Sequence, residues 1–158
     1  GMITANIIGA FEETLETVVL LSAFIPLIMD SAGNTGTQAL TVAVRNLALG
    51  NIGPGSILKT LWRELATGFL LGLACTLMLL IIIPLLYPSG DIMLAVIVGL
   101  TLIITLSLSA VVGAIIPVII KKLKIDPAVA SGPFITTIND IMGLLIYFTI
   151  ATSLLGYL

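Results

Sequence analysis

The strongest constraint on this chain is the length of its apolar segments. Residues 65–87 and 92–120 contain no charged side chain, and each segment exceeds the roughly 20 residues that an α-helix needs to cross a bilayer. Over the whole chain, 59% of the residues are hydrophobic and 9% are charged, and the mean hydropathy is +1.27. Soluble domains carry about 25% charged residues. The sequence therefore predicts an all-α integral membrane protein.

Charged and turn residues divide the chain into segments that we interpret as five membrane helices. The first segment is too short to span a bilayer and is interpreted as the end of a truncated helix, with a short interfacial segment as the alternative. The second segment is interrupted by the polar run DSAGNTGTQ. The five segments are 1–10, 18–43, 65–87, 92–120 and 126–158.

The distribution of charge predicts the orientation of these helices. All six basic residues lie in the segments 45–63 and 121–124, which two predicted spans separate and which therefore share one side of the membrane. The glutamates of 12–16, Asp91 and the C-terminus fall on the other side. Because basic loops favour the cytoplasm, we expect a multi-pass protein of the cell membrane (plasma or bacterial inner membrane), with the C-terminus outside.

The residue types that are missing exclude several classes of function. The chain has no histidine and a single cysteine, Cys75, so His-containing zinc sites and Ser-His or Cys-His nucleophile pairs are excluded. It also has no glycine-rich phosphate loop and no basic aromatic patch. We therefore expect neither an enzyme nor a nucleic-acid partner. An intramembrane aspartyl enzyme is also disfavoured, because the YD and GxGD motifs of intramembrane proteases are absent.

Four glycines within the apolar segments predict close helix packing. Gly68 and Gly72 form a small-xxx-small pair, and we assign Gly99 and Gly113 the same role in the next helix.

Asp140 lies inside the last apolar segment, where an isolated carboxylate costs several kcal/mol. With Asp126 as N-cap and Pro127 as the first helical residue, about 13 residues at 1.5 Å each place Asp140 roughly 20 Å deep. No Lys or Arg is expected at that depth, so its partner would be water, a proton or a cation. We favour an ion pathway over the alternative, in which Asp140 only hydrogen-bonds a neighbouring helix.

Asp30 is a second carboxylate in an apolar segment, within PLIMDSAGNTGTQ. We expect Pro26, Gly33 and Gly36 to loosen this helix and to free backbone carbonyl groups. Asn34 and the neighbouring Thr and Gln side chains add neutral oxygen atoms, which suit hard cations such as Mg²⁺. The alternatives are a kinked helix whose polar groups satisfy one another, and an Asp30 that faces a partner helix.

Two longer motifs carry a resemblance to a known family. Residues 26–50 read PLIMDSAGNTGTQALTVAVRNLALG, and residues 126–148 read DPAVASGPFITTINDIMGLLIYF. In sequence, order and spacing they resemble the MgtE family of magnesium channels and transporters.

The resemblance implies a homodimer with five helices per subunit and a pore near the two-fold axis. It identifies Asp140 as the residue that binds hydrated Mg²⁺, the transported ion, and places Thr136 and Gly132 at neighbouring pore positions. Asn34 matches a secondary pore contact, and Asp30 is kept as a further candidate ligand. Residues 1–158 are expected to be a single pore domain without the cytoplasmic amino-terminal and CBS domains of the family.

Three functions remain open on the residues alone. The first is a magnesium or divalent-cation pore, in which the hydrated ion passes Asp140 along the dimer axis. The second is an exchanger that couples divalent cations to Na⁺ or H⁺, which a protonatable Asp140 also suits. The third is a structural membrane subunit that transports nothing.

Overall fold

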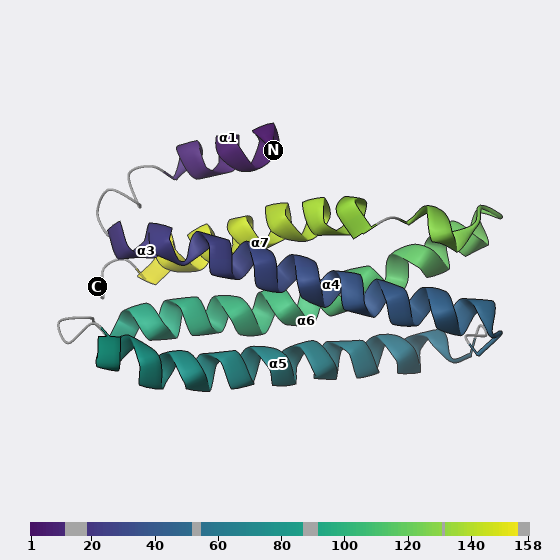
Figure 1. Cartoon of the computed structure of the whole chain (residues 1–158), viewed down its shortest axis with the longest axis horizontal. Coiled ribbons are helices and arrows are strands. Elements are labelled where there is room, and N and C mark those ends of the chain that lie inside the picture. The colour runs from purple at the N-terminus through teal and green to yellow at the C-terminus, as the bar shows by residue number, and fades with distance from the viewer. Residues whose placement is uncertain (12–18, 52–54, 87–91, 131, 155–158) are drawn as a thin grey trace.

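A computed structural model describes residues 1–11, 19–51, 55–86, 92–130 and 132–154 (Figure 1). Within these ranges the chain is helical and has no strand, which confirms the all-α prediction for this part of the molecule. The elements in chain order are α1 (Met2–Ala10), α3 (Val19–Ala23), α4 (Ile25–Ala48), α5 (Ile57–Leu86), α6 (Ile92–Lys122), the 3₁₀ turn η1 (Pro127–Val129) and α7 (Gly132–Leu154).

Three of the described helices, α5, α6 and α7, are long and apolar enough to cross a membrane. They correspond to the last three predicted spans. The first predicted span is represented by α1, and the second by α3 together with α4. In the 18-residue apolar stretch of each helix, 17% of α5 is buried inside the protein, compared with 50% of α6. The helix α6 is therefore central, and α5 presents a largely apolar outer surface.

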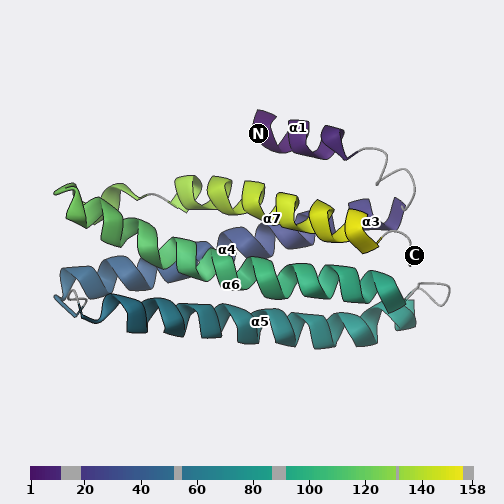
Figure 2. The same cartoon turned by 180° about the vertical axis from the view of Figure 1, so that it is seen from behind.

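The long helices form a bundle around α6 (Figures 1 and 2). This helix packs against α4, α5 and α7, and α4 also packs against α7. The helices α5 and α7 run antiparallel to α6, whereas α4 runs parallel to it, and α1 lies at the edge against α7. Two helices of opposite direction, α4 and α7, are thus placed side by side.

Both segments of basic residues that the structure describes lie at one end of the bundle. The C-terminal ends of α4 and α6 and the start of α5 meet there (Figure 1). Lys121 connects them directly, because its Nζ donates a hydrogen bond of 3.1 Å to the carbonyl of Leu47. The predicted acidic side, with the glutamates of 12–16 and Asp91, lies outside the described residues.

The glycines that were expected to allow close packing do so. A Cβ added at Gly72 would lie 2.5 Å from the Cα of Ile103, and one at Gly68 would lie 2.6 Å from the Cα of Ser107. At Gly99 it would meet the side chain of Thr76, whose hydroxyl donates to the Gly99 carbonyl at 3.0 Å. These glycines bring α5 and α6 into backbone contact.

Gly113 plays the same part on the other side of α6. A Cβ added there would meet the carbonyl group of Gly36 and would lie 3.1 Å from the Cβ of Ala39. The backbones of α4 and α6 therefore touch at this point, which confirms the role predicted for Gly113.

The predicted break in the second span is wrong in position. Residues 30–38 lie within the continuous helix α4, and the irregularity falls at Phe24, between α3 and α4. Pro26 lies in the first turn of α4, where a missing N–H group costs nothing. Gly33 and Gly36 are buried in the helix, where close packing against neighbouring helices compensates for their flexibility.

The predicted start of the last helix is also wrong. Pro127 begins the 3₁₀ turn η1, and α7 starts at Gly132. Asp140 is therefore about 12 Å along a helix about 33 Å long, instead of roughly 20 Å deep. It still lies well inside the helix.

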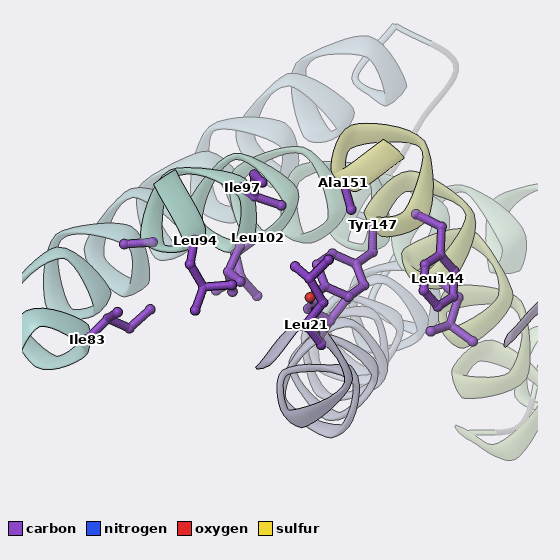
Figure 3. Packing of buried hydrophobic residues seen from close by; sticks show 12 residues of the cluster. Leu21, Ile83, Leu94, Ile97, Leu102, Leu144, Tyr147 and Ala151 are labelled. Carbon is purple, nitrogen blue, oxygen red and sulfur yellow. Dashed lines mark hydrogen bonds between the residues drawn. The ribbon is translucent and has the colours of Figure 1, made fainter. Parts of the chain in front are cut away.

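A hydrophobic core fills the end of the bundle where α3 and α7 meet α6 (Figure 3). Tyr147 is fully buried in this core, and its hydroxyl donates a 2.7 Å hydrogen bond to the carbonyl of Leu21 in α3. Leu144, Leu102 and Ile97 are also fully buried in the cluster. The hydroxyl of Tyr147 thus ties the short helix α3 to α7.

Replacing Tyr147 by phenylalanine should lower the stability of the protein by about 1 kcal/mol, because the buried carbonyl of Leu21 loses this donor. Thermal unfolding in detergent measures the change. Thr149→Val is the control, because the exposed Thr149 hydroxyl bonds only to Leu145 of its own helix. An equal loss in both variants would contradict a specific role for the Tyr147 bond.

Candidate ion-binding groove

An open groove of about 430 Å³ lies between α4 and α7. It brings together Asp30 and Asn34 of α4 with Thr136 and Asp140 of α7. These are four of the five candidate ligands predicted from the sequence. The remaining lining residues are Ile25, Pro26, Met29 and Gly33.

The α4 wall follows from helical spacing. Pro26, Asp30 and Asn34 are four residues apart, so they lie one above another on the same face of the helix. Asp30 and Asn34 are both exposed on the surface of the chain. Their oxygen atoms are therefore accessible from the groove.

The α7 wall follows the same rule. Thr136 and Asp140 are one turn apart, and both are half-buried. The hydroxyl of Thr136 donates a 3.0 Å hydrogen bond to the carbonyl of Pro133. The hydroxyl proton therefore points to this carbonyl and not into the groove. The lone pairs of the oxygen remain available to a cation or a water molecule.

Gly33 allows the two walls to approach. A Cβ added at this position would lie 3.1 Å from Cγ2 of Thr136 and 3.6 Å from Oδ1 of Asp140. The floor of the groove is therefore the bare backbone of α4. A side chain at this position would occupy the space beside the Asp140 carboxylate.

Gly132, the fifth predicted site residue, does not line this groove. It is the first residue of α7, two turns before Asp140, and a Cβ added there would lie 3.7 Å from Cγ2 of Thr37.

The chemistry of the groove suits a hydrated divalent cation. The lining offers two carboxylates, one amide and one hydroxyl, and no lysine or arginine is among its lining residues. Across the described part of the chain, no three His, Cys, Asp or Glu side chains gather closely enough to form a metal cluster. Magnesium usually keeps several water molecules and binds through one or two carboxylates, which is the donor set that this groove presents.

Comparison with known proteins identifies the family. Residues 25–150, which include both walls of the groove, match the family model of the MgtE divalent cation transporters. The chain belongs to the MgtE family. The matched segment covers α4 to α7 almost completely.

Curated MgtE proteins are similar over nearly the whole chain. The magnesium transporter MgtE of Bacillus subtilis (strain 168) is 42% identical over 153 residues, or 97% of this chain. The magnesium transporters MgtE of Enterococcus faecalis and Thermus thermophilus are 36% and 34% identical over 99% and 98% of it. In each case the matched region is 34% of the relative, so the chain spans about a third of their length. These relatives are named as transporters.

Two residues at or next to the groove have no site role in the sequence prediction. Gly33 is interpreted there only as a helix-loosening residue, although it forms the floor of the groove. Asn139 carries no prediction, although it is fully buried directly beside Asp140. For Gly33, the sequence signal is its spacing from Gly36. Two glycines three residues apart lie on one face of a helix, and such a face can pack closely against another helix as readily as it can weaken the helix.

Proposed function

We propose that this chain forms part of a magnesium transport pathway, in which hydrated Mg²⁺ passes through the groove between α4 and α7. The observation that supports this most directly is the meeting of Asp30 and Asp140, from different helices, in one groove without a basic lining residue. Two carboxylates that share a site repel each other unless a cation, a proton or water intervenes. The names of the related transporters favour Mg²⁺ as the cation.

The open side of the groove favours a homodimer. A groove that exposes carboxylates towards lipid would be strongly destabilising, because hydrocarbon solvates neither charge nor hydrated ions. A second copy of the chain would cover it and would add two further carboxylates around the same path. The proposed pore therefore runs along the two-fold axis, with five membrane helices from each subunit.

We propose that the basic end of the bundle faces the cytoplasm. Lys121, Lys122 and Arg45 lie in the last turns of α6 and α4, and basic residues near the ends of spans favour the cytoplasmic side. Mg²⁺ entering the cell would then be drawn by both its gradient and the membrane potential.

Purified protein in liposomes should carry Mg²⁺ down its electrochemical gradient, and an inside-negative potential of 100 mV should favour entry by about 4.6 kcal/mol per divalent ion. A fluorescent Mg²⁺ indicator inside the liposomes measures the flux, with protein-free liposomes as the control. Replacing Na⁺ by choline and abolishing the pH gradient should leave the flux unchanged.

Other results identify the alternatives. A flux that requires a Na⁺ or H⁺ gradient would replace the passive pore by a coupled exchanger. The absence of any flux from a folded, dimeric protein would instead favour the structural subunit.

A further inference from the structure

Directly behind the groove, α7 carries a buried amide that has no hydrogen-bond partner. Asn139 is fully buried, and both its Oδ1 and its Nδ2 are unpaired. It precedes Asp140 in the chain but points into the protein, whereas Asp140 lines the groove. An unpaired buried amide lowers stability, so hydrogen bonding within this arrangement does not account for its presence.

The helix α6, which packs against α7, carries further buried polar groups of the same kind. Thr105 and Ser109 of α6 are fully buried, and their hydroxyl oxygens are also unpaired. Thr101 and Ser107 of the same helix differ from them, because they donate to the carbonyls of Ile97 and Ile103. Gly143, one turn after Asn139, faces Thr105, so this polar patch lies where α4, α6 and α7 meet.

What Asn139 does have is a steric partner on α4. A Cβ added at Gly36 would overlap its Nδ2 and would lie 3.1 Å from both its Cγ and the Cγ2 of Ile135. One turn earlier on α4, Gly33 faces Thr136 and Asp140 in the same way. The two glycines thus form a smooth strip on α4, and the Asn139 side chain fits against one end of it.

This glycine strip connects the buried contact between Asn139 and Gly36 to the groove. Asp30 and Asn34 lie on the adjoining face of α4, so any shift of α4 along or around α7 changes their positions relative to Asp140. Backbone and side chain are in direct contact at Gly36, and an interior packed at this density transmits such a shift rather than absorbing it.

We infer that Asn139 is a positioning residue for the ion groove. Its side chain, seated against Gly36, sets the register of α4 on α7 and so holds Asp30 and Asn34 opposite Thr136 and Asp140. The inference rests on the proposed function, because it assigns Asn139 a role in Mg²⁺ passage without contact with the ion.

A steric rescue tests the inference. Gly36→Ala should reduce Mg²⁺ flux per folded protein roughly tenfold or more, because a displacement of about 1 Å spoils a preorganised site. Adding Asn139→Ala removes the overlapping amide, and the methyl group added at position 36 then fills its space against α7, so the double variant should return to within about threefold of the parent. The unfolding temperature should fall and recover in parallel.

The matched control removes a buried polar group, as Asn139→Ala does, but frees no space next to Gly36. Thr105→Val removes a hydroxyl from the same buried patch without changing the volume that faces Gly36. The combination Gly36→Ala with Thr105→Val should therefore remain as impaired as Gly36→Ala alone. Equal rescue of Gly36→Ala by Asn139→Ala and by Thr105→Val would overturn the inference.

Ion selectivity separates positioning from simple support of the fold. Asn139→Ala alone should change the ratio of Mg²⁺ flux to Ca²⁺ flux, whereas a purely structural residue would alter only the amount of folded protein. If Gly36→Ala does not fold, this ratio decides the matter, and a parental ratio overturns the inference. Parental flux in a folded Gly36→Ala variant would do the same. A parent without Mg²⁺ flux would instead refute the proposed function itself, and the positioning role with it.

Discussion

Replacing Asp140 by alanine or asparagine should abolish Mg²⁺ flux while leaving the protein folded. Asp140 is half-buried in the wall of the groove, well inside α7. A charge without compensation inside a membrane costs roughly 2.5–3.5 kcal/mol, so removing the counter-charge should slow a passing cation by roughly 100-fold, which amounts to a loss of measurable flux. Folding should survive, because no lysine or arginine lines the groove, so Asp140 forms no ion pair there with a basic side chain.

The experiment compares initial Mg²⁺ flux at matched amounts of folded protein. Asp30→Asn, on the opposite wall, should reduce flux less than Asp140→Asn does, because Asp30 is more exposed and interacts more strongly with water. Glu64→Gln removes a carboxylate from α5, away from the groove, and should leave flux at the parental level. Unchanged flux in both Asp140 variants would remove this residue from the ion path. A loss of folded dimer that parallels the loss of flux would indicate a helix-packing aspartate instead.

The candidate site can be predicted because its residues are costly where they lie. A carboxylate inside an apolar segment has few stable environments, so Asp30 and Asp140 stand out in the amino-acid sequence alone. That they share one groove with Asn34 and Thr136 depends on how α4 crosses α7, and spacing along a single helix does not contain that information. Gly132, which the resemblance to the family adds two turns before Asp140, does not line this groove.

Helix boundaries are predicted less well, for a related reason. Glycine and proline have low helix propensity, and the polar run around Asn34 therefore predicts an interruption of the second span. In the folded chain, the absence of side chains at Gly33 and Gly36 lets α4 contact α7 and α6 closely, and this packing outweighs the propensity. Similarly, the Asp126-Pro127 pair has the composition of a helix start, yet it begins only a short 3₁₀ turn.

The glycines that join α5 to α6 should be among the least replaceable residues of the chain. Gly68→Ala and Gly72→Ala gain helix propensity, which favours the variant by up to about 1 kcal/mol per site. The added methyl group, however, would meet backbone atoms of Leu106 and Ser107 in the first case and of Ile103 in the second. Backbone atoms cannot rotate away as a side chain can, so α5 must move as a whole. We expect a net loss of about 3 kcal/mol for either variant.

Gly9→Ala provides the matched control for this prediction, since an added Cβ at Gly9 in α1 meets nothing within 4 Å. It makes the same chemical change with a gain in propensity that is at most equal, because Gly9 lies in the last turn of α1, and its unfolding temperature should equal or slightly exceed that of the parent. The three variants are compared by thermal unfolding in detergent and by the folded fraction in size-exclusion chromatography. If Gly68→Ala and Gly72→Ala proved as stable as Gly9→Ala, the backbone contact between α5 and α6 would be contradicted.

Because the groove lies between α4 and α7, a destabilised variant that still folds should retain the Mg²⁺ to Ca²⁺ flux ratio of the parent. The packing of α5 and the selectivity of the groove should therefore be separable properties of the same bundle.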